Sequence, residues 1–126
     1  MKARNLRESF RYAGTGIAQA FESERNIKIH VGAAIAVGAI ALVMRVRPVE
    51  AVVVVIAATS VIVAEMINTA LERCIDLVSP DYHPLAAKVK NIAAGAVLIA
   101  TIGAVIVGIV ILGPYVVREY LSLRGR

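Results

Sequence analysis

Four polar side chains of the kind that handle phosphates or metal ions follow a long apolar run in the middle of the chain. The uncharged segment 51–64 ends at Glu65, and Asn68, Glu72 and Asp76 follow it at spacings of three, four and four residues. On an α-helix, which turns about 100° per residue, these side chains fall within a stripe roughly 80° wide. They therefore form one polar face of a helix.

Of the four residues of this face, Glu65 is the one that a purely structural role explains least well. Its neighbours in the sequence are aliphatic, and an ionisable residue inside a membrane is costly and functional by default. Asp76 is equally well explained as the polar end of a helix in water. Together with Glu24, the acids offer the hard oxygen ligands that Mg²⁺ takes when it also holds phosphates. Lys90 would neutralise those phosphates as a point charge.

The composition is typical of an integral membrane protein with one domain, 1–126. Apolar residues make up 59% of the 126 residues, against about 45–50% in soluble domains, and the mean hydropathy is +0.75. The single cysteine, Cys74, excludes an intramolecular disulfide and is predicted to be a small buried apolar residue. The first thirty residues are too charged for a cleaved signal sequence.

Charge and motifs exclude several classes of protein. The net charge of +5 is expected to mark the cytoplasmic face, and because no basic patch with aromatic residues is present, no nucleic acid partner is expected. No Gly-rich phosphate loop occurs, so the chain is neither a P-loop enzyme nor a protein kinase.

The hydrophobic pattern predicts an all-α fold with one surface helix and three membrane helices. In segment 4–25, Leu6, Phe10, Ala13, Ile17 and Phe21 recur at helical spacing and form one apolar face, which predicts an amphipathic helix on the membrane surface. Segments 27–46, 49–76 and 90–117 are the predicted membrane helices, since a span needs roughly 20 apolar residues. The prolines at 48, 80 and 84 mark the connections between them.

The distribution of basic residues predicts the orientation. Nine Lys and Arg residues lie on the side of the N-terminus (2, 4, 7, 11, 25, 28, 73, 88 and 90), and five lie on the other side (45, 47, 118, 124 and 126). By the positive-inside rule, the N-terminus and the acidic face are expected on the cytoplasmic side of the inner membrane.

Several runs of residues together resemble one known family. These are "ERN" at 24–26, "E-x-x-N-T-A-L-E-x-x-x-D" at 65–76, "H-P-L-A-x-x-x-K" at 83–90 and "AAGAV" at 93–97. The chain resembles the small prokaryotic diacylglycerol kinases over residues 5–112, and within them the branch that phosphorylates undecaprenol. The resemblance implies an integral membrane lipid kinase that uses MgATP and forms a homotrimer with active sites between subunits. Undecaprenol is the implied acceptor, with diacylglycerol as the alternative.

The resemblance also implies a role for each matching residue. Glu65 would be the catalytic base that takes the proton of the lipid hydroxyl, with Asn68 beside the reacting centre. Glu24 and Glu72 would hold the metal ion and with it the ATP. The other implied ATP-binding residues are Tyr12, Asp81, Tyr82, His83, Lys90 and Asn91, and Ser9 would lie on the lipid side.

Two positions depart from the family pattern. Asn91 stands where the family usually has aspartate, which removes a charge and one acceptor. This leaves three explanations: a tolerated variant, an inactive relative that still binds its ligands, or a substitution that traps a bound state. Asn5 aligns with an arginine expected near the nucleotide, a role that Arg4 or Arg7 would then take.

A small transporter or channel subunit is the alternative from another class of protein. Such proteins also carry a buried glutamate, but near the middle of the bilayer and along a pathway. The clustering of the acids at one end of the apolar run, close to Lys90, favours an enzyme.

Overall fold

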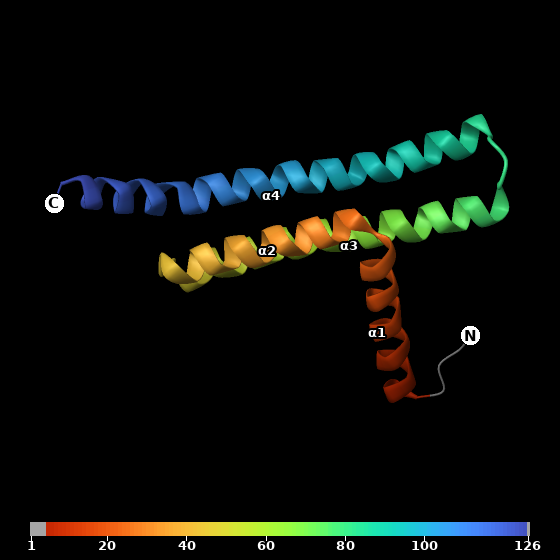
Figure 1. Ribbon diagram of the computed structural model, residues 1–126, viewed down its shortest axis with the longest axis horizontal. Helices are drawn as coiled ribbons and strands as arrows, with labels where there is room; N and C mark the ends of the chain where they lie inside the picture. The colour runs from red at the N-terminus through yellow and green to blue at the C-terminus, as the bar shows by residue number, and fades with distance from the viewer. Residues whose placement is uncertain (1–4, 126) are drawn as a thin grey trace.

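The computed structural model describes residues 5–125, which form four α-helices joined by short connections (Figure 1). They are α1 (Leu6–Ser23), α2 (Arg25–Val43), α3 (Pro48–Val78) and α4 (Pro84–Arg124). Residues 5–125 contain no β-strand. The predicted all-α fold class is therefore confirmed. The predicted surface helix begins at Arg4, which, like Lys2 and Arg126, lies outside the described residues.

Helices α2, α3 and α4 run side by side, whereas α1 leaves them at a steep angle (Figure 1). Each of the three parallel helices is long and apolar enough to cross a membrane, which confirms the predicted number of spans. Helix α3 lies in contact with both α2 and α4, and it packs most extensively against α4. The polar face of α3 is therefore held between two other helices.

The connections follow from local sequence signals. Pro48 occupies the first turn of α3, where its missing N–H costs nothing, and the Glu50 carboxylate accepts a hydrogen bond from the Arg47 N–H at 3.1 Å. Pro84 begins α4 in the same way, and His83 caps the helix by accepting a hydrogen bond from the Leu85 N–H at 3.2 Å. Between α1 and α2 the chain is broken only at Glu24.

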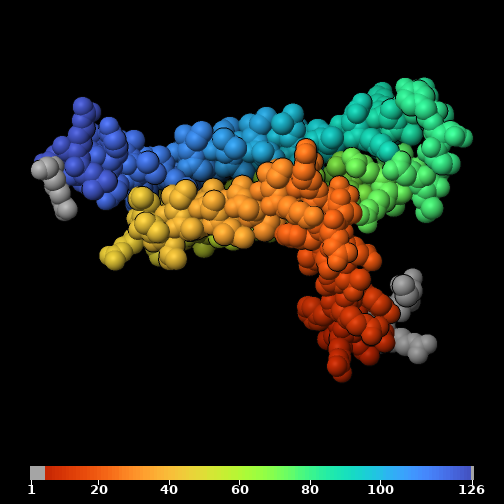
Figure 2. Space-filling model, viewed as in Figure 1, coloured from red at the N-terminus to blue at the C-terminus, as the bar shows by residue number. Residues whose placement is uncertain are grey.

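Helix α4 is longer than the predicted membrane segment 90–117. It has 41 residues, which corresponds to about 62 Å at 1.5 Å per residue, about twice the hydrocarbon thickness of a bilayer. It starts before Lys90 because Pro84 and His83 form a helix start, and it continues through Pro114 to Arg124. In Figure 2 its blue C-terminal end projects beyond the ends of α2 and α3.

The single chain has a thin core and a large apolar surface. Its buried hydrophobic residues are mostly small or of medium size: Ala20, Ile27, Ala41, Val54, Val61, Ala93, Val97 and Leu112. Most of the large aliphatic residues of the three apolar helices are exposed. The glycines of these helices make no close approach within the chain, since a Cβ added at any of them meets no atom within 4 Å. These surfaces need lipid or another copy of the chain to cover them.

Cys74 differs from the prediction. The residue is exposed, so the expectation of a buried cysteine is wrong for the single chain. It lines an apolar depression of about 380 Å³ between the end of α3 and the start of α4, together with Leu71, Val78 and Val89. The two helices separate here to form the turn at 79–83, so no neighbouring helix covers the cysteine.

Candidate active site

The polar face of α3 is buried at its centre. Glu65 is 3% exposed, Asn68 is 8% exposed and Thr69 is 5% exposed, so a carboxylate and an amide lie in the packed part of the bundle. The Glu65 carboxylate forms no hydrogen bond or ion pair within residues 5–125. A buried carboxylate without a partner is a candidate for a functional group.

Asn68 links the buried part of this face to its more open part. Its Nδ2 donates a hydrogen bond to Glu72 Oε1 at 3.1 Å, while its Oδ1 is buried and has no partner in the described part of the chain. Leaving a buried acceptor without a partner costs about 1–3 kcal/mol. A substrate donor or a cation beside Asn68 would remove this cost.

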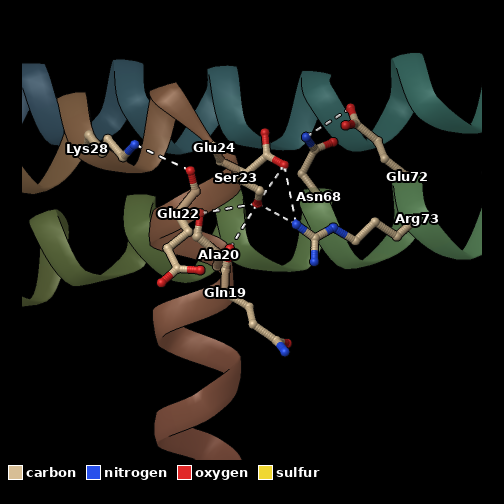
Figure 3. A network of polar contacts seen from close by, with 9 residues as sticks. All are labelled: Gln19, Ala20, Glu22, Ser23, Glu24, Lys28, Asn68, Glu72 and Arg73. Carbon is tan, nitrogen blue, oxygen red and sulfur yellow. Dashed lines mark hydrogen bonds and ion pairs between the residues drawn. The ribbon is translucent and has the colours of Figure 1, made fainter.

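Glu24 reaches the same region from the junction of α1 and α2. Its Oε1 lies 3.7 Å from Arg73 Nη2, and Arg73 also donates a hydrogen bond to the Ser23 hydroxyl. Figure 3 shows Glu24, Asn68, Glu72 and Arg73 in one neighbourhood, with Glu24 extending toward α3. The fold thus brings Glu24 to Arg73, the residue after Glu72, although Glu24 and Arg73 are 49 positions apart in the sequence.

Arg73 is the residue of this region that the sequence analysis did not assign to the site. On a helical projection it lies about 80° from Glu65 and about 60° beyond Asp76, the nearer edge of the polar stripe. The spacing along α3 therefore gave no signal for Arg73. Its guanidinium brings positive charge to a region where phosphate groups would need it.

The polar groups of this region are of the kind that could hold a divalent cation jointly with phosphates. Within residues 5–125, no group of three or more His, Cys, Asp and Glu side chains is arranged to hold a metal ion. Mg²⁺ needs no such group when it also binds substrate phosphates, because one or two carboxylates then suffice. The carboxylates of Glu24 and Glu72 and the unpartnered Oδ1 of Asn68 are hard oxygen donors of the required kind.

Lys90 lies on α4 beside the end of α3. Its Nζ forms an ion pair with Asp76 Oδ1, so the last acid of the polar stripe has a partner on the neighbouring helix. The next residue, Asn91, is exposed. The partner of Lys90 in the single chain is thus the Asp76 carboxylate. A nucleotide phosphate that binds Lys90 would have to displace this carboxylate or bind beside it.

The turn at 79–83 holds three of the predicted nucleotide-binding residues. Asp81 and Tyr82 are exposed, and the Asp81 carbonyl accepts a hydrogen bond from the Ser79 hydroxyl at 3.2 Å. His83 serves as the cap of α4 through Nδ1. The capping function explains its position in the chain without a nucleotide, and its other ring nitrogen is still available for a ligand.

The predicted site residues of α1 lie away from this cluster. Tyr12 is 11 residues before Ser23, about 16 Å along a helix that leaves the bundle at a steep angle (Figure 1). Its ring lies 5.3 Å from the Arg11 guanidinium, and the Ser9 hydroxyl donates a hydrogen bond to the Asn5 carbonyl at 3.3 Å. Asn5 itself caps α1 by accepting a hydrogen bond from the Glu8 N–H at 2.9 Å. One chain does not bring Ser9 or Tyr12 to Glu65.

An apolar groove begins one helical turn from Glu65. It has a volume of about 370 Å³ and lies between α2, α3 and α4, with a lining that includes His30, Val37, Val54, Val61, Thr101 and Leu112. The Thr101 hydroxyl donates to the Val97 carbonyl of its own helix, which leaves His30 as the only other polar side chain of the lining. The lining of the groove is thus almost entirely apolar.

Comparison with known proteins identifies relatives along most of the chain. The family model for prokaryotic diacylglycerol kinase matches residues 11–112. A diacylglycerol kinase of Synechocystis is 43% identical over 113 residues, which are 89% of this chain and 65% of the relative. An undecaprenol kinase of Bacillus subtilis is 34% identical over 107 residues, 85% of this chain and 87% of the relative.

A shorter match is found to a diacylglycerol kinase of Escherichia coli strain K12, which is 38% identical over 52 residues, 41% of this chain. All three relatives are named as kinases, in agreement with the kinase predicted from the motifs. The three apolar helices and this relationship together indicate an integral membrane protein. The match of the family model over residues 11–112, most of the chain, shows that the chain belongs to the prokaryotic diacylglycerol kinase family.

Proposed function

We propose that the protein is an ATP-dependent lipid kinase that phosphorylates the hydroxyl group of undecaprenol at the cytoplasmic face of the inner membrane. The observation that carries the proposal is the buried Glu65 carboxylate, which has no partner in residues 5–125 and lies next to an apolar groove. Within residues 5–125, this carboxylate makes no hydrogen bond or ion pair that would stabilise the single chain. Its chemistry is that of a general base for a hydroxyl group held in lipid.

In the proposed reaction, Glu65 accepts the proton of the lipid hydroxyl as the hydroxyl oxygen attacks the γ-phosphorus of ATP. The bond from that phosphorus to the bridging oxygen breaks, and ADP leaves. Asn68 lies one turn from Glu65, and its unpartnered Oδ1 would accept a hydrogen bond or contact a cation beside the reacting groups. Catalysis rests mainly on positioning and on neutralisation of charge, as phosphoryl transfer requires.

The charge of the phosphates is met by the groups around Glu24. Glu24 and Glu72 would hold Mg²⁺, which supplies positive charge to the phosphate oxygens when bound. Arg73 and Lys90 add positive charge from α3 and α4, where each already contacts a carboxylate. Asp81, Tyr82, His83 and Asn91 would contact the nucleotide from the turn and from the start of α4.

Two acceptors remain candidates because different observations favour them. The groove offers almost no polar group besides His30, which suits undecaprenol, whose only polar group is its terminal hydroxyl. A diacylglycerol also brings two ester groups, for which the groove has few donors. The relationship to a protein named diacylglycerol kinase, at 43% identity, supports diacylglycerol as the second candidate.

We further propose a homotrimer in which α1 completes the active site of a neighbouring subunit. Leu6, Phe10 and Ile17 of α1 are exposed, as expected for an amphipathic helix whose apolar face rests in the membrane surface. Ser9 and Tyr12 belong to the part of α1 that leads away from the bundle, so a role at the reacting centre of α3 would involve a second copy. The exposed apolar sides of α2, α3 and α4 leave room for such contacts.

The test of the proposal is phosphate transfer from labelled ATP in detergent–lipid micelles with Mg²⁺. Undecaprenol and diacylglycerol are offered separately to the protein and to the variant Asn91→Asp. We expect transfer to undecaprenol by both proteins, with a higher rate for the aspartate variant because a carboxylate restores a charge-assisted contact. Transfer to neither lipid by either protein would refute the proposal, and transfer by the variant alone would mark Asn91 as inactivating.

The groove yields a separate prediction about the lipid. Replacing Ala58, which lines the groove, with phenylalanine is expected to raise the KM for undecaprenol about tenfold, since displacing about two methylene groups costs that much affinity. The KM for ATP should not change. Val55→Phe, on the same helix but outside the lining and 61% exposed, is the control. Equal effects of the two variants would show that the lipid chain binds elsewhere.

A further inference from the structure

The last part of α4 is an element that the proposed reaction does not use. Residues 113–124 lie beyond the stretch 11–112 that matches the family model, yet they continue the helix. Figure 2 shows this part projecting past α2 and α3. It therefore has a surface that the other three helices leave uncovered.

Tyr115 marks the level at which α4 leaves the membrane. Its hydroxyl donates a hydrogen bond to Glu50 Oε2 at 2.6 Å, and Glu50 also pairs with Arg47 at 2.6 Å in the turn between α2 and α3. Charged groups such as these belong at the headgroups and not in hydrocarbon. Lys90 and Tyr115 are 25 residues apart, about 37 Å, which is one hydrocarbon thickness with a margin at each end.

The nine residues after Tyr115 are amphipathic. On a helical projection, Tyr115, Arg118, Glu119 and Ser122 fall within an arc about 100° wide. The opposite side carries exposed apolar and aromatic residues: Val116, Val117, Tyr120, Leu121 and Leu123, with exposed fractions between 47% and 64%. Arg124 falls on the apolar side of the projection, about 180° from Tyr115, but it is in the last turn, from which its long side chain can reach a polar layer. If this segment extended into water, its apolar side would be exposed to solvent.

The helix can bend where this segment begins. Pro114 lies inside α4, where it lacks the N–H that would bind the carbonyl four residues earlier, and such positions are the usual sites of kinks. The Tyr115–Glu50 hydrogen bond ties the helix to α3 at the same level. The segment after it makes no hydrogen bond to another helix within residues 5–125.

We infer that residues 116–124 form an interfacial helix that binds the lipid headgroup layer at the end of the bundle opposite the acidic cluster. The apolar side rests on the boundary with the acyl chains, and Arg118 and Arg124 contact lipid phosphates. Tyr115 and Tyr120 are residues of the type that is enriched at this boundary. The charges favour lipid over a second copy of the segment. With two arginines and one glutamate, the segment has a net positive charge, which attracts lipid phosphates and would make two copies repel each other.

Spin labels on the full chain in phosphatidylglycerol–phosphatidylethanolamine vesicles test this inference. In a Cys74→Ala background, labels are placed at Val117→Cys on the apolar side and at Ser122→Cys on the polar side. The ratio of accessibility to oxygen over accessibility to a water-soluble nickel chelate should be several-fold higher at Val117 than at Ser122. Equal exposure of both labels to nickel would overturn the inference, and so would a Val117 label shielded from both reagents, which indicates contact between protein chains.

Two matched changes sharpen the test. Leu121→Glu should move the Val117 label toward water, whereas Ser122→Glu, the same charge on the neighbouring residue, should leave the label in place. Equal effects would overturn the orientation of the helix. The double variant Arg118→Gln with Arg124→Gln should lower the oxygen-to-nickel ratio at Val117, because two cation–phosphate contacts are lost. An unchanged ratio would overturn the assignment of the arginines to phosphates.

Discussion

Replacing Glu65 with glutamine is expected to reduce phosphate transfer by about 10²–10⁴-fold, the usual contribution of a general base. Glutamine keeps the size of the side chain and an acceptor oxygen, but it cannot take the proton of the lipid hydroxyl. Because Glu65 is 3% exposed and lies inside the bundle, a neutral residue removes a buried charge and should not disturb the fold. The rate is measured as transfer from labelled ATP to undecaprenol, and nucleotide affinity is measured in parallel by calorimetry.

The affinity for ATP separates the two roles that a glutamate at this position can have. We expect nucleotide binding to be largely preserved in Glu65→Gln, since only the base is lost. Loss of ATP binding together with the rate would assign Glu65 to the metal site and not to proton transfer. Glu22→Gln is the control, because Glu22 is an exposed acid at the end of α1 whose side chain points away from Asn68 in Figure 3.

Replacing Glu72 with glutamine is expected to lower the rate of phosphate transfer about 10²–10³-fold. This is the loss usually seen when a group that stabilises charge in the transition state is removed. The amide oxygen can still accept the hydrogen bond that Asn68 Nδ2 donates to Glu72, so the local packing is preserved. The negative charge that would hold Mg²⁺ is absent. The concentration of Mg²⁺ that gives half of the maximal rate should therefore rise, and a titration of the rate with Mg²⁺ measures it.

The magnesium titration distinguishes a ligand from a residue that only positions Asn68. If Glu72→Gln lowers the rate with an unchanged magnesium dependence, Glu72 acts through its hydrogen bond to Asn68 and not on the metal ion. Glu119→Gln supplies the comparison. This acid is exposed at the far end of α4, so neither its rate nor its magnesium dependence should differ from that of the unchanged protein.

The central part of the site could be predicted from the sequence because it lies on a single helix. The spacing of Glu65, Asn68 and Glu72 puts them on one face of the helix, however the helix packs against its neighbours. The apolar run before them indicates that this part of the helix is buried. The structure adds that Glu65 and Asn68 are indeed buried. The three long apolar segments were predictable for the same reason, since length and hydropathy are local properties.

Relations between helices could not be obtained in this way. The contact between Glu24 and Arg73 joins residues 49 positions apart, and it depends on the angle at which α1 meets the bundle. The exposure of Cys74 depends on where α3 and α4 separate, which the residues next to it in the sequence do not reveal. The position of Ser9 and Tyr12 relative to Glu65 depends on how copies of the chain assemble, and no pattern within one sequence specifies it.

The break between α1 and α2 has a mechanical consequence. Glu24 is the single residue with extended backbone between the two helices, at φ −107° and ψ 118°. Glu24 is thus both the point about which α1 can turn and the residue whose side chain reaches Arg73. A rotation of α1 about this pivot turns the Glu24 carboxylate as well. In the proposed arrangement, with α1 on the membrane surface, the tilt of α1 would thereby be coupled to the position of Glu24 beside Arg73, and bilayer thickness and curvature would influence the proposed active site.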